Sequence, residues 1–206
     1  MELQMRGRLM AGLVLVLVAL VSACRAAPPA ASGNGPEQLA PDISLNDYNG
    51  AAFRLSDQRG RVVLLNFGYT NCPDVCPIAL AELAKVKQTL GPQASRVQVV
   101  FVTVDPVRDK PARLKEYLGA FDPTFIGLTG PYQALSPVWE DYKVRVDPGG
   151  PEEPTPAPDE RDTKVYDFVG HSAVTFLIDT HGAIRTRYPA QWPADQIVKD
   201  VKEYLK

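Results

Sequence analysis

The sequence predicts an α/β domain of three layers, in which helices cover both faces of a central sheet. Two nearly continuous apolar runs, Val62–Phe67 and Val97–Val104, are typical of strands that are buried on both faces. Between them, Ile78–Leu90 carries apolar residues three or four positions apart, which is the spacing of an amphipathic helix. Buried strands that alternate with helices in this way favour a sheet enclosed between helical layers.

The rest of the domain extends this pattern at both ends. Ile43 and Leu45 alternate with polar residues, and Asn49-Gly50 is a hairpin signal, so a small hairpin is expected before the first buried strand. Further along the chain we expect helices at 113–118 and 133–142, with a short apolar segment at 125–127 between them. Residues 174–179 and 183–188 predict a hairpin of two strands, and Pro193 marks the start of a last helix.

The first residues have the features of an export signal. Two arginines precede an apolar stretch, residues 9–21, which is short for a membrane-spanning helix and typical of the core of a signal peptide. The sequence VSAC that ends at Cys24 resembles a bacterial lipobox, in which cleavage precedes the cysteine and the cysteine carries diacylglycerol. We therefore expect residues 1–23 to be a lipoprotein signal peptide and Cys24 to be lipidated. Ordinary cleavage near Ala26 and an uncleaved anchor are the alternatives.

All of these interpretations predict that the domain is exported. The lipid would hold it on the outer side of the cytoplasmic membrane, in a periplasmic or extracellular location. Residues 24–38 are dominated by Ala, Pro, Gly and Ser and predict a flexible tether, so the globular domain comprises residues 39–206. Within it, residues 147–163 contain five prolines and six acidic residues. Such a segment cannot bury apolar area, which predicts a mobile acidic surface loop.

The charge and the numbers of cysteines and histidines limit the classes of function to consider. The formal net charge of -2 and the isoelectric point of about 5.7 indicate no basic surface for nucleic acid. The 206 residues include only three cysteines and two histidines. Three cysteines do not form a disulfide scaffold. Each cysteine and each histidine therefore needs an explanation of its own.

The segment Gly68–Pro77, with the sequence GYTNCPDVCP, lies between a predicted buried strand and a predicted helix. Pro77 suits the first helical position because it has no N–H to leave unpaired, so Cys76 is expected near the N-cap and Cys72 in the preceding loop. Backbone N–H groups and the helix dipole are then expected to lower the pKa of both thiols. A redox-active dithiol and a soft-metal site for Cu(I) or zinc both fit this pair. A structural disulfide would close too short a loop to gain much.

The two histidines differ in their surroundings. His171 follows a glycine and comes just before the predicted strand 174–179. In a sheet of this kind, strand ends meet at the ligand-binding edge beside helix N-termini, which makes His171 a candidate partner of the cysteines. His181 lies in a turn between two predicted strands, and we expect it to be a structural or surface residue.

Three blocks of sequence together resemble the Sco/SenC family of copper chaperones: GYTNCPDVCP, then TVDPVRDKP at 103–111, and then GHS before TFLID. The resemblance runs from about Pro41 to the C-terminus, and the CPDVCP block is highly specific. It implies a thioredoxin-like three-layer fold with a central mixed sheet, flanking helices and an added N-terminal hairpin. It also implies that Cys72, Cys76 and His171 bind copper, mostly discussed as Cu(I), although the family also binds Cu(II).

The resemblance implies a metallochaperone, which is not an enzyme, that delivers copper to the copper A centre of cytochrome c oxidase subunit II. Other periplasmic copper chaperones and thioredoxin-like reductases are further expected partners, and the N-terminal lipid would contact the membrane. The long acidic segment 147–163 departs from the family's pattern and bears on these partner contacts.

Two other functions would use the same cysteine pair. One is an exported thiol–disulfide oxidoreductase with Cys72 and Cys76 as its redox disulfide, and the other is a copper or redox sensor. Thioredoxin-like oxidoreductases resemble one another in having a proline just before the strand that faces the dithiol, whereas residues 172–174 read Ser-Ala-Val. Three residues between the cysteines, in place of two, are a further departure. Delivery and sensing would use identical ligands.

Two aspartates are candidates for a supporting role around the cysteines. Asp74 lies between them and is either an outer carboxylate beside the metal ligands, a partner-facing group or a solvated loop residue. Asp105 is a similar candidate and, with Arg108, could brace the next loop. Turn and helix capping are the simpler explanation for Asp105 and Arg108.

Overall fold

The structure is a computed structural model, and it describes residues 38–147, 170–171 and 173–206. The predicted signal peptide, Cys24 and the tether as far as residue 37 lie outside the described residues, as do Ser172 and positions 148–163 of the predicted acidic loop. Only the backbone of Asp147, Gly170 and His171 is described. In the described ranges, no helix is both long enough and apolar enough to cross a membrane.

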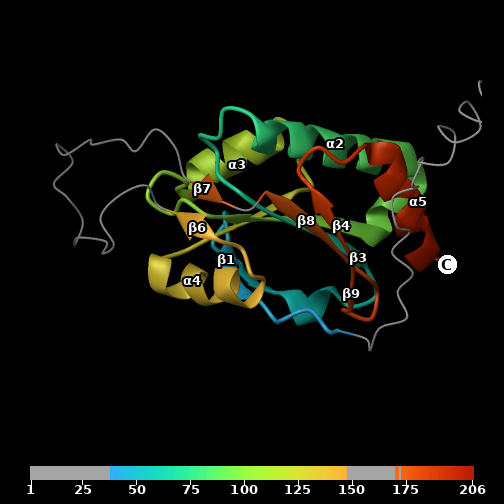
Figure 1. The fold of residues 1–206 in the computed structure, drawn as a ribbon, viewed down its shortest axis with the longest axis horizontal. Helices are drawn as coiled ribbons and strands as arrows, with labels where there is room; N and C mark the ends of the chain where they lie inside the picture. The colour runs from blue at the N-terminus through green and yellow to red at the C-terminus, as the bar shows by residue number, and fades with distance from the viewer. Residues whose placement is uncertain (1–37, 148–169, 172) are drawn as a thin grey trace, which may run out of the picture. The chain divides into compact units, whose positions relative to one another are not determined.

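A seven-stranded mixed sheet forms the centre of the domain, in the order β2-β1-β5-β4-β3-β8-β9 (Figure 1). The strands β3, β4 and β5 are parallel, β8 is antiparallel to β3 and to β9, and the hairpin β1–β2 continues the sheet beyond β5. The strands are β1 (Ser44–Asp47), β2 (Ala52–Arg54), β3 (Val62–Gly68), β4 (Val97–Thr103), β5 (Ile126–Thr129), β8 (Val174–Ile178) and β9 (Ile184–Pro189). A separate antiparallel ladder pairs β6 (Val146–Asp147) with β7 (Gly170–His171).

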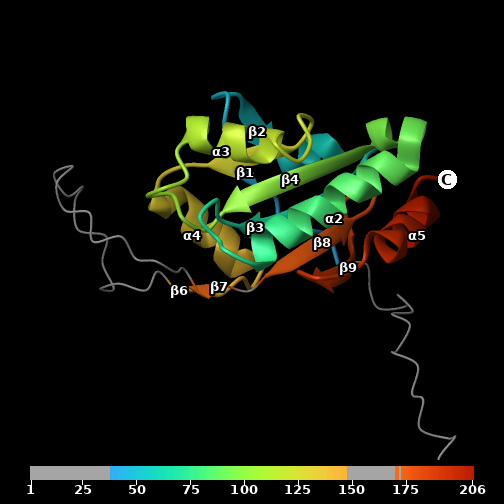
Figure 2. The same ribbon diagram turned by 90° about the horizontal axis from the view of Figure 1, so that it is seen from above.

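Helices cover both faces of this sheet, as Figures 1 and 2 show. The described helices are α2 (Val75–Leu90), α3 (Pro111–Gly119), α4 (Tyr132–Asp141) and α5 (Ala194–Tyr204), with the 3-10 helices η1 (Leu55–Gln58) and η2 (Gly91–Arg96). One core cluster joins α2, α3 and α5 to one face of the sheet, and the other joins α4 and the β1–β2 hairpin to the opposite face. The expected three-layer α/β fold with a mixed sheet and an N-terminal hairpin is confirmed.

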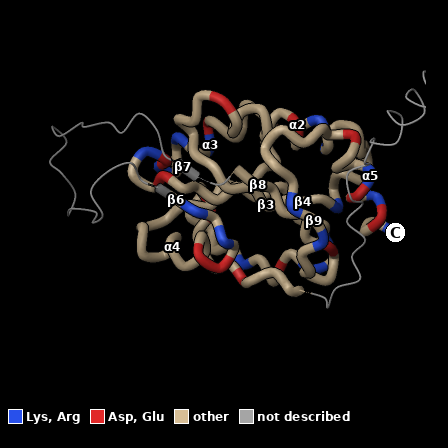
Figure 3. The backbone as a smooth tube through the Cα atoms, viewed as in Figure 1, with Lys and Arg blue, Asp and Glu red and all other residues tan. Residues whose placement is uncertain are grey.

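The two central strands account for this layering. All seven residues of β3 and all seven of β4 are buried, so each strand needs apolar partners on both of its faces. Side chains of β3 alternate between the clusters: Val63, Leu65 and Phe67 face the α4 side, and Val62 and Leu64 face the α2 side. Charged residues lie on the helices, the loops and the outer strands such as β9 (Figure 3), and the inner strands β3, β4 and β8 have none.

Several boundaries differ from the sequence prediction. Helix α2 begins at Val75, so Cys76 is its second residue and Pro77 its third. Proline is tolerated throughout the first turn, where N–H groups have no intrahelical acceptor, so it did not mark the helix start. Asp147, the first residue of the predicted acidic loop, belongs to β6. The β6–β7 ladder was not predicted, because two-residue strands carry no periodicity.

The contact between α3 and β5 generates a prediction about packing. A Cβ atom on Gly127 of β5 would lie 2.6 Å from Leu118 Cδ1 and 2.8 Å from Leu114 Cδ2, and both leucines are fully buried. We expect Gly127→Ala to lower the free energy of unfolding by about 1–3 kcal/mol, because the core has no room for the methyl group. Urea denaturation of the reduced protein measures this.

Gly119→Ala is the matched control for this substitution. Gly119 is the last residue of α3, and a Cβ atom there would meet no atom within 4 Å. Alanine is favoured over glycine in a helix by up to about 1 kcal/mol, so this variant should be as stable as the wild type or slightly more stable. Equal effects of the two substitutions would contradict the packing argument.

Candidate metal and thiol site

The cysteine pair lies where β3 ends and α2 begins. β3 ends at Gly68, a short loop carries Cys72, and Cys76 lies in the first turn of α2. Neither Cys72 nor Cys76 forms a disulfide, and they are only 8% and 3% exposed, respectively. The backbone N–H of Cys76 donates to Cys72 Sγ at 3.4 Å, so the two residues are in direct contact. The prediction that two thiols lie together beside a helix N-terminus is confirmed.

Gly68 allows the close approach of Cys76 to the sheet. A Cβ atom on Gly68 would lie 2.9 Å from Cys76 Sγ and 2.9 Å from Phe101 Cε2, which is closer than real Cβ atoms come. The sulfur of Cys76 therefore occupies space that any side chain at position 68 would claim. The glycine of the GYTNCPDVCP block is explained by this contact.

Burial dominates the electrostatics of Cys76. Removal from water raises the pKa of its thiol well above the ordinary value, and the hydrogen bond with the backbone N–H of Tyr69 lowers it by less. The hydrogen bond with Cys72 and the negative charge of Asp109 add to the rise. The expectation that the helix N-terminus lowers the pKa of this thiol is wrong, because the sequence did not reveal how deeply the sulfur is buried.

The other candidate ligands are placed less completely. His171 lies in β7, where its backbone pairs with Val146, and β7 lies toward the end of the sheet at which α2 begins (Figures 1 and 2). The side chain of His171 lies outside the described part. Asp74 is exposed and is the N-cap of α2 without a side-chain capping bond. Among the side chains that are described, no group of three His, Cys, Asp or Glu residues is arranged to hold a metal.

His181, which we expected to be a surface or structural residue, lies in the turn between β8 and β9. Its backbone N–H donates to Asp179 Oδ1 at 2.9 Å, and the residue is exposed. This turn follows the end of β8, whereas β7 precedes the start of that strand. The prediction for His181 is confirmed.

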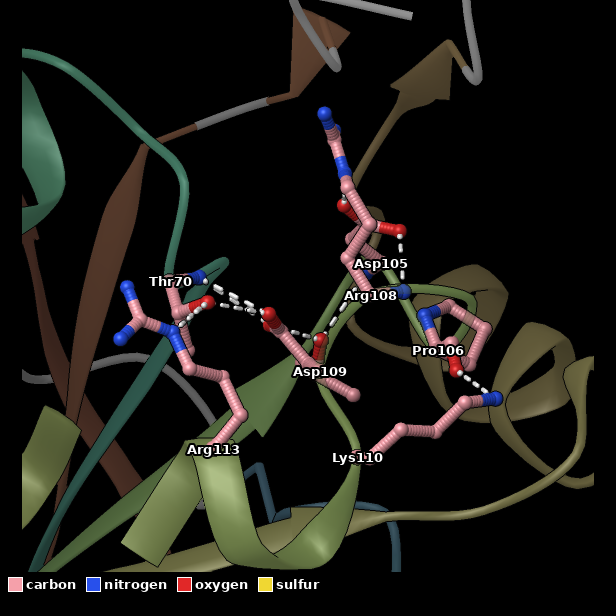
Figure 4. Close-up of polar contacts among 8 residues, drawn as sticks. Thr70, Asp105, Pro106, Arg108, Asp109, Lys110 and Arg113 are labelled. Carbon is pink, nitrogen blue, oxygen red and sulfur yellow. Dashed lines mark hydrogen bonds and ion pairs between the residues drawn. The ribbon is translucent and has the colours of Figure 1, made fainter. Parts of the chain in front are cut away.

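Asp105 forms a turn with Arg108 in the loop after β4. The side chain of Arg108 forms an ion pair with Asp105, and the backbone N–H of Arg108 donates to Asp105 Oδ1 at 3.3 Å (Figure 4). The guanidinium carbon of Arg108 also lies 5.7 Å from the centre of the Tyr69 ring, three residues before Cys72. The turn-bracing interaction of Asp105 and Arg108 is therefore present, and it reaches the cysteine loop.

Sequence reasoning missed Asp109, which is fully buried beside this loop. Its carboxylate accepts hydrogen bonds from the Thr70 hydroxyl at 2.7 Å and from the Thr103 hydroxyl at 2.6 Å. Burial raises the pKa of the Asp109 carboxyl, and the bonds from Thr103 and Thr70 oppose the rise. The only local sign in the sequence was an aspartate within TVDPVRDKP, which reads as an ordinary turn residue.

Tyr117 of α3 is a second residue that the sequence did not single out. Its hydroxyl is buried and has no hydrogen-bond partner among the described residues. Burial raises the pKa of Tyr117, and the charges that Cys76, Cys72 and Asp109 carry when ionised raise it further. A buried phenol and a buried carboxylate thus lie close enough to the cysteines to interact with them electrostatically.

The fold and the site define the class of this protein: a thioredoxin-like domain with two buried thiols, not joined by a disulfide, at the start of its first long helix. Comparison with known proteins then gives the family. The SCO1/SenC family model matches residues 31–206, and the chain belongs to this family.

Its relatives share most of their length with it. A SCO2-like protein of Rickettsia felis is 36% identical over 168 residues, which are 80% of this chain and 74% of the relative. The structure of Bradyrhizobium japonicum ScoI with copper bound has a TM-score of 0.65 and 32% identity, and the match covers 81% of this chain and 99% of that one. A SCO1/SenC family lipoprotein from Bacillus anthracis has a TM-score of 0.67 and 26% identity, over 82% of this chain and 96% of that one.

The buried thiol generates a prediction about pH. Cys76 stays protonated in the folded state at pH values where a thiol of the unfolded chain, with a pKa of about 8.5, already ionises. Its contribution to stability is fully present below about pH 8.5 and is lost as the pH rises further, because the folded state then binds more protons than the unfolded state. We expect a loss of up to about 1.4 kcal/mol per pH unit from this one group.

Urea denaturation of the reduced wild type and of Cys76→Ala, at intervals from about pH 7 to 9.5, measures this effect. The cavity left by the substitution costs the same at every pH, so the stability difference between the two proteins should shrink as the pH rises. The buried tyrosines ionise only above about pH 10 and are common to both proteins. A difference that stays constant over this range would contradict the assignment to Cys76.

Proposed function

We propose that this protein binds Cu(I) through Cys72, Cys76 and His171 and delivers it during the assembly of cytochrome c oxidase. The observation that carries the proposal is the pair of buried cysteines that are in contact at the start of α2 and are not joined by a disulfide. It is supported by membership of the SCO1/SenC family and by a relative, B. japonicum ScoI, that was solved with copper bound.

The chemistry of the donors suits this cargo. Thiolates select soft ions, and Cu(I) accepts two sulfurs and an imidazole without a strong geometric demand. The sulfur of Cys76 is almost fully shielded from water, so the metal would replace a proton in a site of low polarity. Because that proton must leave, the affinity for copper should rise with pH. The position of β7 toward the end of the sheet at which α2 begins supports His171 as the third ligand.

The proposed recipient is the copper A centre of cytochrome c oxidase subunit II. This choice of recipient rests on the family resemblance. Donation requires the copper to be reached by the partner's ligands. The site lies at the edge where β3 and β4 end, and the exposed residues Pro73 and Asp74 follow Cys72 there. We therefore propose that the partner approaches this edge of the sheet.

We also propose that Cys24 anchors the protein through a lipid, with the domain on the outer side of the cytoplasmic membrane. The sequence VSAC at 21–24 and the tether that follows it support this arrangement. The B. anthracis relative, a SCO1/SenC family lipoprotein, is consistent with it.

The ligand set makes a direct prediction. The reduced protein should bind one Cu(I), and Cys72→Ser or Cys76→Ser should nearly abolish tight binding because each removes a thiolate. His171→Ala should weaken binding by about 10- to 100-fold, since two thiolates remain. Anaerobic titration in competition with a chromophoric Cu(I) chelator measures these affinities.

His181→Ala is the control, because His181 lies in the β8–β9 turn and is the other histidine of the sequence. It should bind Cu(I) like the wild type. If it lost as much affinity as His171→Ala, the third ligand would have been assigned wrongly. A reduced protein that exchanges disulfides rapidly but takes up no Cu(I) would favour the alternative oxidoreductase function.

Cellular copper supply tests the delivery step. Deletion of the gene should lower the copper A content of cytochrome c oxidase, most clearly in medium with little copper, because free copper can otherwise load the centre without a chaperone. Expression of the wild type should restore the content, and expression of Cys72→Ser should not. Normal copper A content in copper-limited deletion cells would overturn delivery and leave copper or redox sensing.

A further inference from the structure

Threonines at or just after the ends of three parallel strands converge on one buried residue, Asp109. Thr103 and Thr129 are the last residues of β4 and β5, and Thr70 follows β3 by two residues. The hydroxyls of Thr70 and Thr103 donate to the Asp109 carboxylate at 2.7 and 2.6 Å, and the hydroxyl of Thr129 donates to its backbone carbonyl at 3.1 Å. One residue of the β4–α3 loop thus ties together three strand ends at the edge that carries the cysteines.

The carboxylate is held entirely by neutral donors. Asp109 is 0% exposed, and no lysine or arginine of the described ranges forms an ion pair with it. A buried carboxylate is costly unless its oxygens are hydrogen-bonded, so the donors around it are held firmly in place. Figure 4 shows Thr70 facing Asp109, and Arg113 of α3 reaches the Thr70 hydroxyl, with Nε at 3.4 Å.

This arrangement acts on the cysteine loop through the backbone. The backbone N–H of Thr70 also donates to both carboxylate oxygens, at 3.2 and 3.1 Å. Thr70 lies within a tight turn, which the N–H of Cys72 closes by donating to the Tyr69 carbonyl at 3.3 Å. The segment that carries Cys72 is therefore fixed at one end by Asp109 and contacts α2 at the other through the bond from Cys76 to the sulfur.

We propose that Asp109 is a positioning residue of the copper site, which holds the Tyr69–Cys72 turn so that Cys72 faces Cys76 before the metal arrives. Asp109 does not bind copper itself. The inference rests on the proposed function, because it explains how the two thiol ligands are arranged in advance. Binding to a prearranged pair avoids the cost of ordering the loop, so a loosened loop should bind copper more weakly.

Asp109→Asn tests this, because the amide keeps the shape of the side chain but replaces an acceptor oxygen with a donor. We expect its Cu(I) affinity to fall by about 10- to 100-fold in chelator competition, as for residues that orient metal ligands. Asp179→Asn is the matched control. Asp179 is also buried, at 2% exposure, and accepts from the backbone N–H groups of His181 and Ala183 at the end of β8 remote from β7. It should bind Cu(I) within about twofold of the wild type, whatever it costs in stability.

A second pair of variants keeps the test decisive if Asp109→Asn fails to fold. Thr70→Ser retains the hydroxyl and should bind Cu(I) like the wild type, whereas Thr70→Val loses the 2.7 Å bond and should bind more weakly. A purely structural role would lower the thermal stability of Thr70→Val without separating the copper affinities of the two variants. Equal affinities of Thr70→Ser and Thr70→Val would overturn the proposal.

The outcomes separate this inference from the proposed function. Suppose that the wild type binds Cu(I). If the affinity of Asp109→Asn is then within about twofold of the wild type, the positioning role is wrong and the copper function stands. The same follows if Asp179→Asn loses as much affinity as Asp109→Asn. If the wild type binds no Cu(I), the copper function fails, and the thiol–disulfide equilibrium with glutathione decides the positioning role. A change of about tenfold or more in that constant for Asp109→Asn alone would support it, and an unchanged constant would overturn it.

Discussion

The burial of β3 and β4 on both faces is the constraint on which the rest of the structure depends. Every residue of both strands is buried, so helices must cover the sheet on either side. The strands are parallel and in register from Val62 opposite Val97 to Gly68 opposite Thr103, which brings their carboxyl ends to one edge. The loop with Cys72 and the loop with Asp109 both leave the sheet there, so they meet because of the strand pairing alone.

Close packing at this edge decides the chemistry of the thiols. Helix α2 lies so near the sheet that the sulfur of Cys76 fills the space above Gly68, beside the ring of Phe101. A sulfur in this position is shielded from water and keeps its proton, although it lies in the first turn of a helix. The reactivity of the Cys76 thiol is thus restrained until it loses its proton, and the thiolate that then forms suits a soft metal ion.

Two aspartates four residues apart, Asp105 and Asp109, both stabilise the loop that precedes Cys72. Asp105 is buried, and its ion pair with the partly exposed Arg108 holds that guanidinium over the Tyr69 ring. Asp109 lies inside, where the hydroxyls of Thr70 and Thr103 satisfy its oxygens. Both contacts reach the short stretch between β3 and Cys72, from the solvent side and from the core. The block TVDPVRDKP therefore belongs to the same structural unit as GYTNCPDVCP, although 25 residues separate them.

The sequence by itself determined the layers of the fold and the location of the thiol pair. Apolar runs and helical spacing are local properties, and they marked β3, β4 and α2 directly. Tertiary structure decided the rest. The pKa of Cys76 depends on burial by Gly68 and Phe101, which no local pattern records. The role of Asp109 depends on donors from three strand ends, and the β6–β7 ladder depends on a pairing between distant positions. Interactions of this kind exist only once the sheet has brought separate segments together.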